Sequence, residues 1–313
     1  MNSIDLHCDT IMRLMEEDKS EGLYRNSLSV DIEKLRAGKA QAQFFAMFIN
    51  LQTDGDPLVR ALRMIDRFYQ EIEGNKQYIA LARNYGEFQQ NQADGKLSAF
   101  LTIEEGEALK GELINLRNFY RLGVRLITLT WNYPNEIGHP STLPECRERG
   151  ITPFGREVVA EMNRLGMLID VSHLSNQGFY EVAALTQKPF VASHSNAWSV
   201  TSHHRNLTDE MIKVLATKGG VMGINFEKSF LGSAPVSRVE DMVLHIQHIY
   251  NVGGIEVIAI GSDFDGISPE LELSHAGEMS KLVGALGKAG FSQSEIDKIC
   301  WKNALRVIKD TLY

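Results

Sequence analysis

The first apolar stretch of the chain ends on two polar side chains that are suited to binding a metal. Ile4 and Leu6 alternate with polar residues as in a short strand, and His7 and Asp9 follow at once. Residues two apart in an extended segment project to the same side, so this imidazole and this carboxylate can converge on one point. Such a pair is half of a site for a first-row divalent metal. An isolated pair is more often a surface histidine beside a capping aspartate, so the interpretation depends on further ligands.

Four more side chains of the same chemistry follow other apolar stretches of the chain. They are Glu104, His173, His194 and Asp263. Taken singly, each has a structural explanation: an acid at the start of a helix, a histidine bonded to backbone carbonyls, or an aspartate in a turn. What they share is a position at the C-terminal end of a predicted strand. This shared position favours a common site.

The strands that would position these groups number eight. They are centred on Ile4, Phe44, Phe100, Ile127, Leu168, Val191, Met222 and Ile258, and most are separated by helical patterns. This alternation predicts an α/β fold with a parallel sheet, closed as a (β/α)8 TIM-type barrel whose C-terminal strand ends meet at one face. An open doubly wound sheet is the alternative, but no glycine-rich phosphate-binding motif follows a strand. We expect a single domain, residues 1–313.

Several helices carry clear boundary signals. Pro57 opens a helix that we expect to run through Gly74, and Ser175 and Thr208 are typical N-caps of two later helices. Only helix is expected between Gly74 and Asp94. One continuous helix is expected from Ser292 to Leu312.

Composition excludes several classes of partner. With 40 acidic and 32 basic residues the formal charge is −8, which disfavours nucleic acid as a partner. The three cysteines are scattered without a CxxC motif, so neither a disulfide framework nor a thiolate zinc site is indicated. No apolar run approaches the roughly 18 residues that cross a bilayer. The metal-binding pattern starts close to Met1 and leaves no room for a signal peptide, so we expect a cytoplasmic protein without a membrane partner.

The chemistry of the six groups is coherent. Histidines and carboxylates suit zinc, and less well manganese, cobalt or iron. A carboxylate between two histidine-containing halves can bridge two metals about 3.5–4 Å apart, and such a pair holds a hydroxide and polarises a carbonyl. A further carboxylate can move the proton to a leaving amine. This is the equipment for hydrolysing an amide bond.

Short motifs around these groups resemble those of the membrane (renal-type) dipeptidase family of binuclear zinc peptidases, in a soluble bacterial-type form. The motifs are His7-Cys8-Asp9-Thr10, Ile103-Glu104, Thr128-Leu129-Thr130, Asp170-Val171-Ser172-His173, Ser193-His194-Ser195, Arg205-Asn206, the run from Gly261 to Gly266, and Asn303-Ala304-Leu305-Arg306-Val307. The resemblance covers nearly the whole chain. It implies a TIM-type barrel that hydrolyses dipeptides, including those with a D-residue on the C-terminal side.

The resemblance also implies roles for individual residues. Two zinc ions per chain are implied, with His7 and Asp9 as ligands of one and His173 and His194 as ligands of the other. Glu104 would bridge them, because it keeps the family's spacing to Thr128-Leu129-Thr130, although its neighbour Glu105 is the alternative. Asp263 matches the acid that transfers the proton. Arg205 matches a basic residue that helps to bind the substrate.

The chain departs from the family pattern at two positions. Glu105 stands where the family usually has glycine, and Trp131 stands where the mammalian enzymes have a histidine that contacts the tetrahedral intermediate. Asn132, His139 or another loop group could replace that histidine, or the metals alone could stabilise the oxyanion. We expect Trp131 and Asn132 to contact the substrate together with Arg205.

Two other functions stay open at this point. The same binuclear site could hydrolyse another C–N bond, in an N-acyl amino acid or a lactam, and Trp131 keeps this alternative open. A catalytically silent metal-binding scaffold is the second alternative, but it would not need the complete set of acids and histidines. The family resemblance also leaves a homodimer open.

Overall fold

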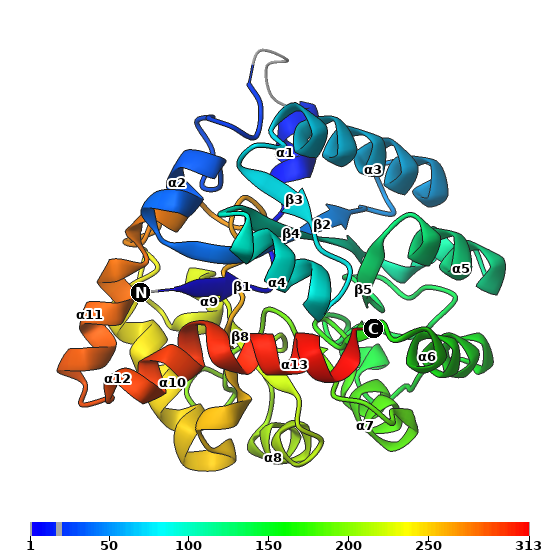
Figure 1. Ribbon diagram of the computed structural model, residues 1–313. Coiled ribbons are helices and arrows are strands. Elements are labelled where there is room, and N and C mark those ends of the chain that lie inside the picture. Colours follow the sequence, from blue (N-terminus) through cyan, green and yellow to red (C-terminus); the bar gives the residue numbers. More distant parts are fainter. Residues whose placement is uncertain (1, 17–20, 313) are drawn as a thin grey trace.

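A closed parallel barrel lies at the centre of the computed structural model, which describes residues 2–16 and 21–312 (Figure 1). Met1, residues 17–20 and Tyr313 of the expected domain lie outside the described residues. Within the described residues, eight parallel strands form the barrel: β1 (Ser3–Asp5), β2 (Ala40–Phe48), β4 (Leu97–Glu104), β5 (Val124–Thr128), β6 (Leu168–Asp170), β7 (Val191–Ala192), β8 (Val221–Ile224) and β9 (Ile258–Ile260). They are the eight predicted strands, and the predicted (β/α)8 barrel is confirmed.

The barrel closes between β2 and β4. The strand order is β2-β1-β9-β8-β7-β6-β5-β4, and β2 also pairs with β4, from Ala42 opposite Ser98 to Phe48 opposite Glu104. An additional short strand, β3 (Ile79–Leu81), pairs with the first residues of β4. The expectation of helix alone in this part of the chain is therefore wrong at β3, because three residues are too few for an alternating pattern to stand out.

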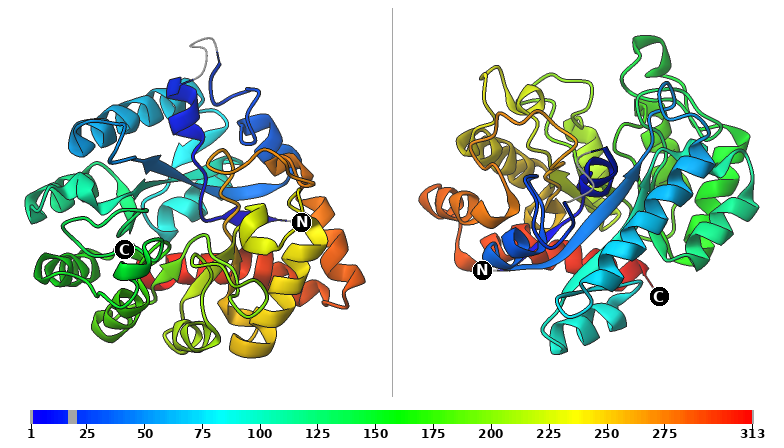
Figure 2. Two further views of the ribbon diagram at one scale, coloured as in Figure 1. Left: turned by 180° about the vertical axis from the view of Figure 1, so that it is seen from behind. Right: turned by 90° about the horizontal axis from the view of Figure 1, so that it is seen from above.

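Helices surround the barrel (Figures 1 and 2). They are α1 (Thr10–Glu16), α2 (Ile32–Ala37), α3 (Pro57–Gly74), α4 (Tyr85–Ala93), α5 (Leu113–Arg121), α6 (Pro153–Leu165), α7 (Asn176–Leu185), α8 (Asp209–Thr217), α9 (Lys228–Leu231), α10 (Val239–Gly253), α11 (Ser280–Lys288), α12 (Gln293–Asp297) and α13 (Asn303–Thr311). The predicted start at Pro57 and the predicted N-caps Ser175 and Thr208 are confirmed, since both caps accept a hydrogen bond from a backbone N–H of the first turn. In the described ranges no helix is both long enough and apolar enough to span a bilayer.

The last helical segment changes its pitch along its length. Helix is found over the expected range, from Gln293 to Thr311, but a π-helical segment at Lys298–Lys302, which was not expected, stands between α12 and α13. Sequence periodicity over one turn cannot reveal such a local change of pitch. α13 crosses one end of the barrel, in front of the strands in Figure 1 and behind them in the reverse view of Figure 2.

The inside of the barrel is filled at its N-terminal end. Ile4 of β1 and Phe44 of β2 belong to one apolar cluster with Ala304, Val307 and Ile308 of α13. Burying these side chains stabilises the closed end by about 25 cal/mol for each Å² of apolar surface removed from water. Because α13 seals this end, polar groups inside the barrel are left to the opposite end, where the strands finish.

Candidate metal centre

The predicted site residues come together at the C-terminal end of the barrel. Glu104 is the last residue of β4, and the others stand just beyond the ends of strands: His7 and Asp9 after β1, His173 after β6, His194 after β7 and Asp263 after β9. The histidines, Asp9 and Glu104 are buried, and the side chain of Asp263 is 14% exposed. Residues separated by more than 250 positions therefore form one polar cluster at this end of the barrel.

Glu104 lies between two sets of ligand atoms. Its Oε2 atom is 3.2 Å from Nε2 of His7, while its Oε1 atom is 3.0 Å from Nε2 of His173 and 3.5 Å from Nε2 of His194. On the His7 side, Oδ2 of Asp9 lies 3.4 Å from the same Nε2 atom. On the other side, the Nε2 atoms of His173 and His194 are 3.0 Å apart. Each oxygen of this carboxylate thus faces a different set.

The residues present fit divalent metal ions. Three buried atoms here have no hydrogen-bond partner among the described residues: Nδ1 and Nε2 of His7 and Oδ1 of Asp9. A buried polar atom without a partner costs about 1–3 kcal/mol. Imidazole nitrogens and carboxylate oxygens are ligands that suit first-row metals, and ligand atoms of His7, Glu104 and His194 lie within 4.8 Å of one another, as do those of His7, Asp9 and Asp263. A cation held between His7 and Asp9 would satisfy Nε2 of His7.

The electrostatics of the cluster favour an ionised Glu104 and neutral rings at His173 and His194. Burial alone would raise the pKa of Glu104, but the nearby histidines outweigh it and hold this pKa well below its ordinary value. Burial, reinforced by Arg205, lowers the pKa of His173 to about 3, and burial together with the charge of His7 lowers the pKa of His194 well below its usual range. Burial also opposes a charge on His7, but Glu104 and Asp9 raise its pKa well above the ordinary value. A bound cation favours the neutral form of this ring as well.

Hydrogen bonds behind the histidines orient their rings. Nδ1 of His173 lies 3.0 Å from Oδ1 of Asn132, which also accepts a hydrogen bond from the Thr142 hydroxyl. Nδ1 of His194 lies 2.8 Å from the Ser193 hydroxyl. A ring that donates from Nδ1 keeps the lone pair of Nε2 free for a metal. The contacts found for Asn132 are therefore with a histidine of the cluster, and its predicted contact with substrate stays a prediction.

Two buried aspartates at strand ends were not singled out by the sequence reasoning. Asp170, the last residue of β6, accepts hydrogen bonds from the backbone N–H and the hydroxyl of Ser193. Asp5, the last residue of β1, accepts them from the same two groups of Ser262. Each carboxylate ties its strand end to a neighbouring strand end that carries a site residue. The signal that could have revealed them is the repeated placement of an aspartate two or three residues before a histidine, at His7 and His173.

Asp263 is held by a residue that the sequence reasoning also missed. Oδ2 of Asp263 accepts a hydrogen bond of 2.8 Å from Nδ2 of Asn225, which follows directly on β8, while Oδ1 lies 3.8 Å from Nε2 of His7. Burial raises the pKa of Asp263 well above its ordinary value; His7 opposes this shift, and the charges of Asp9 and Glu104 add to it. This carboxyl is therefore suited to carrying a proton.

Arg205 places a buried positive charge beside the histidines. Its Nη2 atom donates to the backbone oxygen of His194 at 3.2 Å, and its guanidinium lies 5.4 Å from the ring centre of Phe230. Burial lowers the pKa of Arg205 to about 10, against the attraction of Asp263 and Glu104, so the side chain stays charged at neutral pH. A fixed cation at this place can pair with a carboxylate or a polarised carbonyl of a ligand.

The side chain of Glu105 points away from the ligand cluster. Its Oε2 atom accepts a hydrogen bond from the backbone N–H of Trp131 at 3.1 Å, and its Oε1 atom accepts from the backbone N–H of Glu107 and from the amide of Asn135. Of the two neighbouring acids, the one that faces the histidines is therefore Glu104. Trp131 lies at the edge of the cluster, with its ring centre 6.3 Å from that of His173.

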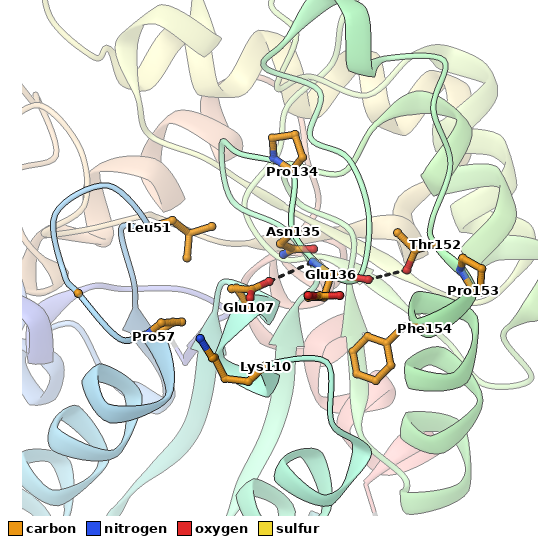
Figure 3. A pocket seen from close by; sticks show the side chains of 11 residues that line it. Leu51, Pro57, Glu107, Lys110, Pro134, Asn135, Glu136, Thr152, Pro153 and Phe154 are labelled. Atoms are coloured by element: carbon orange, nitrogen blue, oxygen red, sulfur yellow. Dashed lines mark hydrogen bonds between the residues drawn. The ribbon is translucent and has the colours of Figure 1, made fainter.

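A separate hollow of about 670 Å³ lies on the outer side of this region (Figure 3). Its lining includes Glu107, Lys110, Asn135, Glu136 and Phe154, and none of the predicted site residues. Two hydrogen bonds within the lining, from Glu136 N–H to Glu107 and from Thr152 to the Glu136 carbonyl, hold its floor in place. The hollow contains no convergent set of ligand atoms, so the chemistry belongs to the barrel end.

Comparisons with known proteins find relatives that match nearly the whole chain. The family model of the membrane dipeptidases (peptidase family M19) matches residues 1–312. A protein of Schizosaccharomyces pombe described as an uncharacterized dipeptidase is 32% identical over 323 residues, which cover 96% of this chain and 76% of that protein. A metallopeptidase of Rhodobacter sphaeroides, solved with a phosphinate mimic of the dipeptide L-Ala-D-Ala, has a TM-score of 0.91 at 26% identity and covers 99% of both chains. A solved dipeptidase of family M19 has a TM-score of 0.92 at 27% identity, covering 100% of this chain and 99% of that one.

Proposed function

The chain belongs to the membrane dipeptidase family, peptidase family M19, and is therefore a metallo-dipeptidase; from this premise we propose that it hydrolyses dipeptides, including those with a C-terminal D-residue, with two bound zinc ions. The observation that carries the proposal is the position of Glu104, whose two oxygens face two different sets of histidine nitrogens. The R. sphaeroides relative with its L-Ala-D-Ala mimic supports the inclusion of D-residues.

The ligand sets follow from the same geometry. His7 and Asp9 would hold one zinc ion, His173 and His194 would hold the other, and Glu104 would contribute one oxygen to each. When bound, the zinc ions lower the pKa of coordinated water and polarise the carbonyl of the scissile bond.

The protein's own groups would do the remaining work. Asn225 donates to Oδ2 of Asp263, so the proton that Asp263 carries resides on Oδ1, the atom that faces His7. From there Asp263 would deliver it to the nitrogen of the leaving amine. Arg205 would pair with negative charge on the substrate, and Trp131 would contact the substrate at the rim. Asn132 would act through the ring of His173.

Metal content and hydrolysis, measured together, test this function. Purified protein is analysed for zinc and assayed on a panel of L-L and L-D dipeptides, before and after chelation and after zinc is restored. We expect two zinc ions per chain, and we expect cleavage to be lost on chelation and recovered when zinc is restored. His173→Ala should lower the zinc content, because it removes an Nε2 ligand.

Other outcomes have definite meanings. Two metal ions without cleavage of any dipeptide would favour another C–N bond, in an N-acyl amino acid or a lactam. Metal binding without hydrolysis of these either would favour the scaffold function. Absence of bound metal under zinc-replete conditions would refute the ligand assignment. A homodimer and a cytoplasmic location stay predictions.

A further inference from the structure

A buried carboxylate joins the end of β4 to the loop that follows β5. The carboxylate belongs to Glu105, and the loop carries Trp131. In the structure, the backbone N–H of Trp131 donates to the carboxylate of Glu105 at 3.1 Å. Because the donor is a backbone N–H, this hydrogen bond fixes the main chain at Trp131 and with it the place from which the indole ring projects.

Glu105 has a backbone conformation that is unfavourable for a residue with a side chain. Glu105 has φ of 103°, a conformation that suits glycine and strains other residues by about 1–3 kcal/mol. Its side chain is fully buried, and both of its oxygens are used, by the N–H groups of Glu107 and Trp131 and by the amide of Asn135. The carboxylate thus ties the end of β4 to the loop that follows β5, which carries Trp131.

The loop held in this way presents aromatic rings beside the metal centre. The ring centre of Trp131 lies 4.8 Å from that of Phe48 and 5.7 Å from that of Tyr133, in edge-to-face geometry. Phe48 pairs in register with Glu104, so the two side chains leave the sheet on the same face. All three rings are only partly buried. Large aromatic rings that keep exposed surface at the mouth of a site offer contact area to a ligand.

We propose that Phe48, Trp131 and Tyr133 form a subsite for an apolar or aromatic side chain of one residue of the dipeptide, and that Glu105 is the positioning residue that holds Trp131 in it. The subsite rests on the proposed dipeptidase function. The ring centre of Trp131 lies 4.8 Å from that of Phe48 and 6.3 Å from that of His173, so a side chain stacked on Trp131 would lie close to a metal ligand. A glycine at position 105 would leave the Trp131 N–H without this acceptor and the loop free to move.

The test compares substrates that differ in one side chain. The zinc-loaded enzyme is assayed on Ala-Ala and on dipeptides in which either alanine is replaced by leucine or phenylalanine, in L and D forms. We expect kcat/KM for the larger side chain to exceed that for alanine by about tenfold or more at one of the two positions. Trp131→Ala and Phe48→Ala should each reduce this ratio towards one, mainly through KM. Tyr180→Ala, which removes an exposed aromatic side chain on α7, is the control and should keep the ratio.

A double-mutant cycle tests the part assigned to Glu105. If Glu105 acts through Trp131, Glu105→Gly should lower the same ratio with zinc content unchanged, and adding it to Trp131→Ala should lower the ratio no further. Glu107→Gln is the control, since Glu107 binds the same loop at Glu136, away from Trp131. Equal loss of kcat on every substrate, or loss of zinc, in Glu105→Gly would overturn the positioning role. Thermal unfolding of each variant checks that it is folded.

A binding experiment separates this subsite from the proposed function. Calorimetry measures the affinity of the zinc-loaded protein for phosphinate mimics of Ala-Ala and of its leucine and phenylalanine analogues. If dipeptides are cleaved but Trp131→Ala keeps the selectivity ratio, the subsite is refuted and the function stands. If no dipeptide is cleaved, the function fails, and a preference for the bulkier mimic that Trp131→Ala abolishes still supports the subsite. Equal affinity for all mimics, or no binding, refutes the subsite.

Discussion

Replacing Asn132 by alanine should weaken zinc binding without removing a metal ligand. The side-chain oxygen of Asn132 is the acceptor for Nδ1 of His173 at 3.0 Å and for the Thr142 hydroxyl at 2.7 Å. Without this acceptor the ring of His173 is free to rotate and to move its proton to Nε2, which then cannot bind a metal. The perturbation therefore reaches the metal through the orientation and tautomer of one imidazole.

The expected size of the effect follows from the surroundings of Asn132. Loss of such a supporting hydrogen bond costs about 10–100-fold in metal affinity. Asn132 is only partly buried, so water can take over as acceptor in the variant. We therefore expect the lower end of this range, a loss of about tenfold or about 1.4 kcal/mol, at the zinc site of His173 and His194. The site of His7 and Asp9 should change much less.

Competition between the protein and a chromophoric chelator measures this effect. Stepwise zinc dissociation constants are obtained for the wild type, Asn132→Ala, Asn132→Asp and Thr142→Val, and KM is measured for each. Asn132→Asp should retain zinc affinity, because a carboxylate accepts the same hydrogen bond from His173. Thr142→Val should also retain it, because it leaves the contact between Asn132 and His173 intact. Unchanged zinc affinity in Asn132→Ala together with a raised KM would refute the reasoning and make Asn132 a substrate contact.

Three further predictions concern other parts of the site and its support. Asp263→Asn should keep both zinc ions yet lose about 10²–10⁴-fold in kcat, the usual contribution of a proton-transfer group, and loss of zinc by elemental analysis would make Asp263 a ligand instead. Gly266→Ala should weaken zinc binding about tenfold in the same chelator assay, because a Cβ atom there would overlap Oδ2 of Asp9 and lie 2.8 Å from Oδ1 of Asp263; unaltered binding would show that the loop yields freely. Burial lowers the pKa of His245 from 6.5 to about 4, so the folded protein favours the neutral ring, and this contribution to stability is complete above pH 6.5 and is lost as the pH falls towards 4. Denaturant unfolding should therefore show that the free energy of unfolding falls by roughly 2 kcal/mol between pH 7 and pH 5, and His245→Gln should lack this loss. Equal losses in the wild type and in that variant would exclude His245 as the source.

Local signals were enough to predict the order of elements. Alternating apolar residues mark the strands, and Pro57, Ser175 and Thr208 mark helix starts, because these effects act within a few residues of the chain. The same rules missed β3 and the π-helical segment Lys298–Lys302, because a stretch of three or five residues is too short for its own periodicity to be recognised in the sequence.

The two adjacent acids show where local rules stop. Successive residues of a strand point to opposite faces, so the sequence implies that Glu104 and Glu105 differ in direction. Which of them faces the histidines depends on the register of β4 against β2 and β5, and a shift of one residue would exchange their roles. The spacing of motifs favoured Glu104, and the geometry of the barrel places its carboxylate between the two histidine sets.

The sequence by itself determined the residue types of the site and their places at the ends of strands, because a barrel brings all such ends to one face. It could not determine which side chains support them. Asn132 contacts His173 across 41 positions, Asn225 contacts Asp263 across 38, and Glu105 contacts Trp131 across 26. Those contacts depend on the conformations of loops and on the registers of neighbouring strands, which no local pattern encodes. They exist only once the barrel has closed.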